Sequence, residues 1–400
     1  MGRTTLVWNV YSECNQRVER VGVSGVGDRT LASALRSVAV APPNGSCGAS
    51  FEVWRVGVRR AVLGAVTAFV TDRCAADLRN TGVDIAPEVL TGFVSDGKCL
   101  RSTFMYLGWL TGAGPDDAAV RAAASFELLH TFALLQDDVM DDSPLRRGLP
   151  AAHVRFADWH RDQGLAGSAD RFGASAAVLL GDLCLVWAEQ MLRESGLSAT
   201  ALARGWPRYD AMRTELAIGQ FADLVNDAGG QPTLEAVLDV ARRKSGNYTV
   251  RRPLEIGGAL AGCGDGMLAM LGRYGAAVGE AFQLRDDLLG IFGSPTVTGK
   301  PAGGDLSEHK ATSVVVAAHH LADATARRRL TELMSQRELT DGDIARWRAL
   351  IAATGAVQWI EQLIDRKLSH ALQRVHASRL DDTVRTALVE MASVCTARAA

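Results

Sequence analysis

The chain carries the sequence LLHTFALLQDDVMDD at residues 128–142. Its first part has the apolar spacing of a buried helix, and four carboxylates fall within its last six positions. Asp137 and Asp141 are four residues apart, so a helix places them on one face. Carboxylates at the C-terminal end of a helix oppose its dipole, at a cost of a few tenths to about 1 kcal/mol each. Pro144 disfavours a further helical turn, and this acidic helix end therefore needs cations to offset it.

The same pattern recurs at residues 282–290, which read FQLRDDLLG. A single Asp-Asp pair is as typical of a solvated helix end as of a site, but two pairs that each close an apolar helix favour a shared function. Oxygen ligands without His or Cys favour Mg²⁺ over zinc or copper, and Mg²⁺ commonly bridges carboxylates to substrate phosphates. The sequence therefore predicts a diphosphate-binding site that uses Mg²⁺.

Basic residues that could bind diphosphates lie near both acidic segments. Lys98 and Arg101 are three residues apart and could grip one anion together. Each cation taken alone is more typical of a surface salt bridge, and the segment around Lys300 lacks the spacing of a phosphate-binding P-loop. As a set, the cations flank the two acidic helix ends: Lys98, Arg101, Arg146, Arg147, Lys244, Lys300 and Lys310.

The periodicity of the chain predicts an all-α fold. Residues 1–50 show turn signals and no sustained helical period, which indicates a poorly ordered N-terminal extension. From residue 51 to residue 400 apolar residues recur at helical spacing, β-type alternation is scarce and no repeat is evident, which indicates one large helical domain. Helices are expected near residues 51–79, 87–111, 116–142, 168–194, 199–227, 233–262, 265–293, 312–337, 340–355, 357–377 and 380–398.

Composition limits the class of protein and its compartment. The chain has 400 residues, 48% of them hydrophobic, and a net charge of −2, which argues against binding of nucleic acid or anionic membranes through overall charge. The seven cysteines form no C-x-x-C pair, so neither a zinc site nor a disulfide framework is expected. We find no stretch of about 20 apolar residues and no signal peptide, and we expect a cytoplasmic protein without a transmembrane segment.

Several motifs, in order along residues 90–315, resemble those of the trans-isoprenyl diphosphate synthase (polyprenyl synthetase) family, short-chain type. Residues 137–141, DDVMD, match its first aspartate-rich motif in full. The resemblance extends to GKCLR at 97–101, the arginine pair at 146–147, GQFAD at 219–223, KSGNY at 244–248 and the partial second motif at 286–290.

The resemblance implies an isoprenoid synthase-like helical bundle with a central substrate cavity. It implies Mg²⁺, as three ions with Mn²⁺ able to substitute, bound by Asp137, Asp141 and Asp286. Residues Asp223, Asp287 and Gln283 would support metal-bound water. The allylic diphosphate would lie on Arg146, Lys244 and Lys300, and isopentenyl diphosphate on Lys98, Arg101, His130 and Arg147. Further catalytic or substrate contacts fall on Asp138, Ser245, Gln283 and Lys310.

The implied reaction is a head-to-tail prenyl transfer. The allylic carbon–oxygen bond ionises, the double bond of isopentenyl diphosphate attacks, and a proton leaves; Mg²⁺ and cations stabilise charge on the leaving diphosphate. Phe132 lies five residues before Asp137, about 7–8 Å deeper along the helix axis. In the family a bulky residue there, with a small one such as Ala133 next to it, goes with geranylgeranyl products. A homodimer is expected from the family alone.

Two departures leave alternatives open. Position 290, the final Asp of the second motif, is Gly, and His309 stands before Lys310 where the family has Gly. A farnesyl diphosphate synthase differs only in product. A class I terpene cyclase would need no second diphosphate site, and a non-catalytic partner subunit is suggested by the two departures but opposed by the intact first motif. His130 could also be a buried core histidine.

Overall fold

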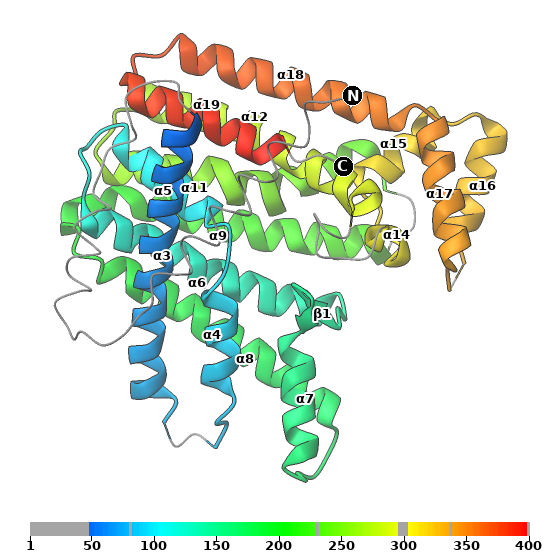
Figure 1. The fold of residues 1–400 in the computed structure, drawn as a ribbon, viewed down its shortest axis with the longest axis horizontal. Coiled ribbons are helices and arrows are strands. Elements are labelled where there is room, and N and C mark those ends of the chain that lie inside the picture. Colours follow the sequence, from blue (N-terminus) through cyan, green and yellow to red (C-terminus); the bar gives the residue numbers. More distant parts are fainter. Residues whose placement is uncertain (1–47, 80–81, 229–231, 295–302, 337, 398–400) are drawn as a thin grey trace.

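The computed structural model describes residues 48–79, 82–228, 232–294, 303–336 and 338–397. The expected N-terminal extension falls almost wholly outside these ranges. Apart from a hairpin of β1 (Leu145–Arg146) and β2 (Leu149–Pro150), the regular elements in the described ranges are helices (Figure 1). They are α3 (Gly48–Asp77), α4 (Ala86–Val94), α5 (Leu100–Leu110), α6 (Asp117–Met140), α7 (Ala152–Asp162), α8 (Ala169–Arg193), α9 (Ala199–Ala228), α10 (Leu234–Val240), η1 (Ala241–Arg251), α11 (Arg252–Leu260), α12 (Asp265–Phe292), α14 (Gly304–Ser307), α15 (Ser313–Leu321), α16 (Ala324–Met334), α17 (Asp341–Ala353), α18 (Ala356–His376) and α19 (Asp382–Thr396). The all-α prediction is confirmed.

The two helices that end in aspartates, α6 and α12, lie inside the bundle. Helix α6 packs against α5 and α8, and α12 packs against η1, α18 and α19. Large side chains such as Phe104, Leu107, Phe126 and Leu129 are fully buried between these layers. Each contributes about 1.5–3 kcal/mol of hydrophobic free energy, so the core fixes where the two acidic ends can lie.

A second, smaller core lies at one end of the molecule. There α14, α15, α17 and α18 pack around the last turns of α12, with Trp347 of α17 fully buried (Figure 1). Helix α17 begins with a capping box, in which Thr340 and Asp343 exchange hydrogen bonds with each other's backbone N–H. This unit holds α14 against the acidic end of α12.

Two close helix contacts depend on glycine. A Cβ on Gly246 of η1 would lie 2.8 Å from the carbonyl carbon of Gly279 on α12. A Cβ on Gly219 of α9 would lie 2.8 Å from the backbone nitrogen of Lys244. Both distances are shorter than any real Cβ contact, so larger residues would push η1 away from α9 and α12. The glycines therefore let Lys244 approach the centre of the bundle.

Two expected helices are each broken in the structure. The helix predicted over residues 87–111 is two helices, α4 and α5, because Cys99 adopts a left-handed backbone (φ 48°) before α5 starts. The helix predicted over 312–337 also breaks, at Ala322 and Asp323, where the Asp323 carboxylate accepts hydrogen bonds from the first N–H groups of α16. At both breaks the chain changes direction, although the helical spacing of apolar residues in the sequence continues.

Helix α7, the strands β1 and β2, the short helix α14 and the π-helical stretch η1 were not predicted from the sequence. Helix α7 and the β1–β2 hairpin lie between the first acidic segment and α8, where no element was expected. The predicted helix 233–262 is continuous but contains an eleven-residue π-helical stretch, η1. π-Helical stretches are rare and occur frequently at functional sites. This one contains the KSGNY segment at residues 244–248.

By length and composition alone, α6 and α8 could each span a membrane. Such helices are also found in the cores of globular proteins, and α6 is mostly buried within the bundle, which accounts for its apolar sequence. Helix α8 is less buried and exposes Leu179 and Val186, at 64% and 57% of their surface.

Candidate active site

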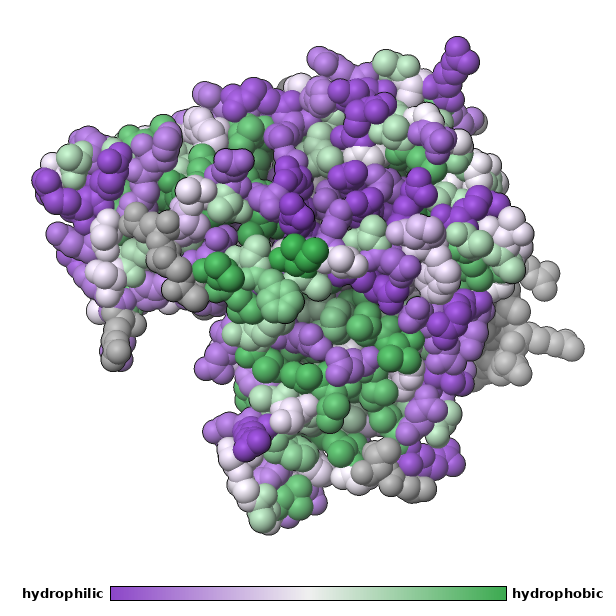
Figure 2. All heavy atoms as spheres, turned by 180° about the vertical axis from the view of Figure 1, so that it is seen from behind, coloured by the Kyte–Doolittle hydropathy of each residue, from purple (hydrophilic) through white to green (hydrophobic). Residues whose placement is uncertain are grey.

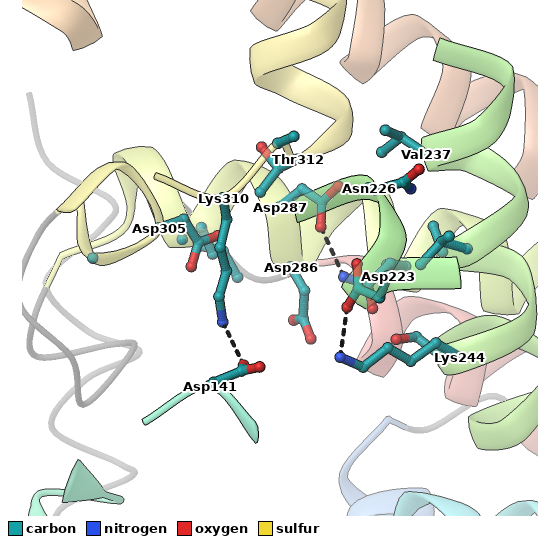
Figure 3. Close-up of a pocket in the computed structure, with 18 of the residues that line it drawn as sticks. Asp141, Asp223, Asn226, Val237, Lys244, Asp286, Asp287, Asp305, Lys310 and Thr312 are labelled. Carbon is teal, nitrogen blue, oxygen red and sulfur yellow. Dashed lines mark hydrogen bonds and ion pairs between the residues drawn. The ribbon is translucent and has the colours of Figure 1, made fainter. Parts of the chain in front are cut away.

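A polar cavity of about 420 Å³ lies between the ends of α6 and α12 (Figure 3). Residues from the two acidic motifs, α9, η1 and the α14–α15 region line it. Of the predicted site residues, the structure places these on its wall: Lys98, Asp141, Asp223, Lys244, Ser245, Gln283, Asp286, Asp287 and Lys310. Segments more than 200 residues apart in the sequence therefore line one cavity.

The first acidic motif divides between cavity and protein interior. Asp138 is fully buried and accepts a hydrogen bond from Arg146 Nε at 2.8 Å. Burial raises the pKa of Asp138, while the Arg146 guanidinium acts to lower it. Arg146 also lies 3.7 Å from Asp137, and the hairpin β1–β2 holds it there. Asp138 thus positions Arg146, whereas Asp141 faces the cavity.

Two lysines neutralise the other carboxylates of this motif. Lys244 Nζ lies 3.0 Å from Asp137 Oδ1 and 2.7 Å from Asp223 Oδ2. Lys310 Nζ lies 3.1 Å from Asp141 Oδ2. Burial acts to lower the pKa of each ammonium, but the neighbouring carboxylates outweigh it and raise both pKa values. Both lysines are therefore cationic at neutral pH.

In the second acidic motif, too, one carboxylate faces the cavity and the other is held by hydrogen bonds within the protein. Asp286 lies between the Lys310–Asp141 pair and the Lys244–Asp223 pair in Figure 3. Asp287 is almost fully buried and accepts hydrogen bonds from Ser313 N at 3.0 Å and Gln283 Nε2 at 2.7 Å. Burial raises the pKa of Asp287 to about 6 against these hydrogen bonds. Asp287 therefore ties α12 to the start of α15, and the Gln283 amide is oriented by Asp287.

The donor set fits Mg²⁺. Asp141 and Asp286 line the cavity, Asp137 lies beside it at 3.0 Å from Lys244 Nζ, and no Cys that would favour a softer metal is among the lining residues. Within the described ranges no three acidic, His or Cys side chains are already arranged around a common metal position. The amino groups of Lys244 and Lys310 lie against these carboxylates instead.

A second cluster of cations lies beside the cavity. The Arg101 guanidinium stacks on the Tyr248 ring at 4.4 Å, and Arg147 Nη1 donates to the Asp96 carbonyl at 2.5 Å. His130 lies close to Tyr248, with ring centroids 6.3 Å apart. Burial, followed by the charges of neighbouring arginines, lowers the pKa of His130. His130 is therefore neutral in this structure.

Three buried polar atoms in this cluster have no hydrogen-bond partner among the residues that the structure describes. They are Arg101 Nε, His130 Nδ1 and Tyr248 Oη. A buried polar atom without a hydrogen bond costs about 1–3 kcal/mol, so such a group of atoms indicates a place for a ligand. Two arginines and Lys98 around them make that ligand an anion. The structure thus brings together Lys98, Arg101, His130 and Arg147, the set predicted for one diphosphate.

Gly290, which departs from the motif pattern, lies on the cavity wall, and His309, the other departure, precedes the wall residue Lys310. His309 adopts the left-handed backbone, with φ 54°, that favours glycine, and Lys310 still reaches Asp141. Position 290 faces the cavity without a side chain of its own. Lys300 lies outside the described residues. Sequence reasoning missed Asp305, Thr312 and Asn226, which also line the cavity; Asp305 could have been noted as a further acid near the second motif.

An apolar cavity of about 630 Å³ lies beside the first acidic motif. Phe132 and Ala133 contribute to its wall from α6, and residues of α9 including Phe221 and Leu224 form the opposite side. Because both predicted chain-length residues line it, this cavity has the position expected for a hydrocarbon tail. Its lining is mostly apolar, with Gln136, Gln220 and Arg213 among the exceptions.

Comparisons with known proteins identify similar sequences. The family model described as polyprenyl synthetase matches residues 84–351. The chain is 32% identical to a geranylgeranyl diphosphate synthase of Mycobacterium tuberculosis over 73% of this chain and 77% of that protein. It is 31% identical to a geranylfarnesyl diphosphate synthase of Aeropyrum pernix, over 70% and 84% of the two chains.

A solved structure is similar over nearly its whole length. The crystal structure of geranylgeranyl pyrophosphate synthase from Corynebacterium glutamicum, complexed with isoprenyl diphosphate and magnesium, has a TM-score of 0.82 and 34% identity to this chain. The match covers 86% of this chain and 99% of that one.

Proposed function

The chain belongs to the polyprenyl synthetase family, and we propose that it is an Mg²⁺-dependent prenyltransferase that condenses isopentenyl diphosphate with an allylic diphosphate. One observation carries the proposal: a carboxylate-lined cavity lies beside a cationic cluster in which Arg101 Nε, His130 Nδ1 and Tyr248 Oη are buried without a hydrogen-bond partner among the described residues. Such a pair of sites suits a reaction that joins two diphosphate esters.

The carboxylate side of the cavity suits the allylic diphosphate. Mg²⁺ held by Asp137, Asp141 and Asp286 would supply positive charge to the departing diphosphate. Arg146 and Lys244 lie within 4 Å of Asp137 and are placed to bind the same phosphates. Lys310 approaches from the other side, at Asp141. These fixed cations stabilise charge that develops as the allylic carbon–oxygen bond breaks.

The second cluster suits isopentenyl diphosphate. Lys98, Arg101 and Arg147 provide positive charge, and Arg101 Nε is a buried donor without a hydrogen-bond partner among the described residues. The Tyr248 ring holds the Arg101 guanidinium in place. Attack by the terminal alkene carbon leaves a cation on the neighbouring tertiary carbon. Loss of a proton from the next carbon along the chain forms the new double bond and completes the transfer, and the departed diphosphate is placed to accept that proton. A terpene cyclase has no use for this second anion site.

Geranylgeranyl diphosphate is the proposed main product. The apolar cavity bounded by Phe132 and Ala133 supports it, as do the names of similar proteins. Farnesyl diphosphate is the alternative product. The assay incubates purified protein with Mg²⁺, labelled isopentenyl diphosphate and farnesyl diphosphate. Labelled prenyl diphosphate supports the proposal; hydrocarbon formed from the prenyl diphosphate alone indicates a cyclase, and no product indicates a partner subunit.

The proposal extends to three Mg²⁺ ions, with Mn²⁺ able to replace them, and to a cytoplasmic homodimer. Apolar side chains exposed on α8 and α9 support the dimer: Val178, Leu179, Val186, Ile218, Phe221 and Val225. Figure 2 shows hydrophobic side chains gathered on the lower half of the face turned away from α3. Large exposed apolar patches are typical of protein interfaces. The number of ions is measured by calorimetric titration of the protein with Mg²⁺ and inorganic pyrophosphate.

A further inference from the structure

The second acidic motif lacks a side chain at the position where its third carboxylate is expected. Gly290 lies four residues after Asp286 on α12, so both occupy one helix face, and both line the polar cavity. A Cβ on Gly290 would lie 2.5 Å from Cγ of Asp305 and 3.0 Å from its Oδ1, and closer still to Oδ2. The carboxylate group of Asp305 therefore fills the space that a side chain at position 290 would occupy.

The fold holds Asp305 in this place. Asp305 belongs to α14, which packs against the end of α12 and is anchored by the fully buried Leu306. The backbone carbonyl of Asp305 accepts a hydrogen bond from the Lys310 N–H at 2.9 Å. Lys310 in turn contacts Asp141 across the cavity, and Figure 3 shows Asp305 beside Lys310 on the same side of Asp286.

We propose that Asp305 supplies, from α14, the carboxylate that position 290 of the second motif lacks, and that it holds the divalent cation–diphosphate group together with Asp286. This inference rests on the proposed function, because it assumes that the cavity binds a metal–diphosphate complex. It accounts for a second motif that ends in glycine within a chain whose first motif is intact, because a side chain at 290 would force the Asp305 carboxylate to move.

The experiment measures Mg²⁺ binding by calorimetry in the presence of inorganic pyrophosphate, which needs no turnover. Asp305→Asn removes the charge and keeps the shape, and we expect its apparent Mg²⁺ affinity to fall about 10- to 100-fold, as for other residues that support metal ligands. Gly290→Ala places a methyl group against the Asp305 carboxylate and should weaken Mg²⁺ binding in the same direction. In the double variant Gly290→Asp/Asp305→Gly the carboxylate is moved to α12, and affinity should return to within a few-fold of wild type.

Two controls match these changes. Gly266→Ala makes the same substitution on α12 where a Cβ meets no atom within 4 Å, and Asp341→Asn removes an exposed carboxylate from α17. Both should bind like wild type. Asp305→Asn protein that binds Mg²⁺ as tightly as wild type would overturn the inference. So would a double variant that keeps the helical circular dichroism spectrum but does not regain affinity, since Asp305 would then act only from its own position.

The proposed function has its own readout. Wild-type protein that binds Mg²⁺ and pyrophosphate no better than Asp286→Ala, and forms no prenyl product, would refute the proposed function and this inference with it. If wild-type protein binds Mg²⁺ with pyrophosphate and forms prenyl product, and Asp305→Asn protein binds Mg²⁺ equally tightly, only the inference about Asp305 is refuted.

Discussion

Lys310 and Asp141 are 169 residues apart in the chain, yet their side chains meet at 3.1 Å across the polar cavity. Lys244 makes the corresponding contact with Asp137 at 3.0 Å. Each lysine thus offsets a carboxylate at the end of α6, where the helix dipole disfavours negative charge. A metal ion that binds these carboxylates competes with the lysines, and the released ammonium groups become available to an anionic substrate.

Lys310→Met should therefore separate metal binding from substrate binding. Mg²⁺ alone is expected to bind more tightly, because a competing cation is gone, while KM for the allylic diphosphate rises about 10- to 100-fold through loss of a charge-assisted hydrogen bond. Calorimetry and steady-state kinetics measure the two effects. Lys367→Met, which breaks an ion pair between α18 and Glu280 of α12 outside the cavity lining, serves as control. A parallel loss of both affinities would contradict this account.

Asp137→Ala and Asp286→Ala should each lower turnover by about 10³-fold, since several kcal/mol of charge stabilisation would be lost. The fold should survive, because a carboxylate at a helix C-terminus does not stabilise the helix. Turnover, circular dichroism and Tm are the measurements. Asp142→Asn changes an exposed neighbour and should leave all three unchanged. Unfolded variants would show instead that the acidic motifs have a structural role.

Phe132→Ala should shift the products toward longer chains, because it removes a wall of the apolar cavity. Chromatography of the dephosphorylated products measures their length. Phe69→Ala truncates a similarly half-buried aromatic residue on α3 and should not alter the product profile. An unchanged profile for Phe132→Ala would exclude this residue as the length determinant.

Phe221→Asp should convert the proposed dimer into a monomer. Phe221 is 71% exposed at the centre of the apolar residues of α9, and a charge there cannot be buried without a partner. Light scattering coupled to size exclusion measures the mass. Val53→Asp places the same charge at a 74% exposed position on α3 and should leave the mass unchanged. A wild-type monomer would refute the dimer directly.

Glu127→Gln should stabilise the protein at neutral pH. Burial raises the pKa of Glu127 above its ordinary 4.5, against the hydrogen bond from Ser102 Oγ and two arginine charges. The folded state therefore holds this proton more tightly than the unfolded state, and wild-type stability falls as pH rises from 4.5 through the raised pKa. Tm of Glu127→Gln should exceed that of wild type at pH 7.5, with the difference shrinking toward pH 4.5. Glu88→Gln, at an exposed site, controls for charge.

The sequence was most informative about features that depend on a single segment of the chain. The helical period and the carboxylates at the ends of α6 and α12 predicted both the fold class and the composition of the cavity wall. The break at Cys99 could not be predicted, because a left-handed residue there depends on how α4 and α5 pack. The position of Asp305 against Gly290 was also not predictable, since it needs the distance between two helices and not the spacing within one.

The π-helical stretch η1 makes the cavity sensitive to chain length. Each residue of an α-helix turns the chain by about 100°. Deleting one residue within 245–251 would therefore rotate the side chains that precede the deletion about the helix axis, relative to those of α11. Such a deletion could spare Lys244 and all the aspartates and still swing the Lys244 ammonium away from Asp137. In this stretch an indel would be as damaging as the loss of a charged residue.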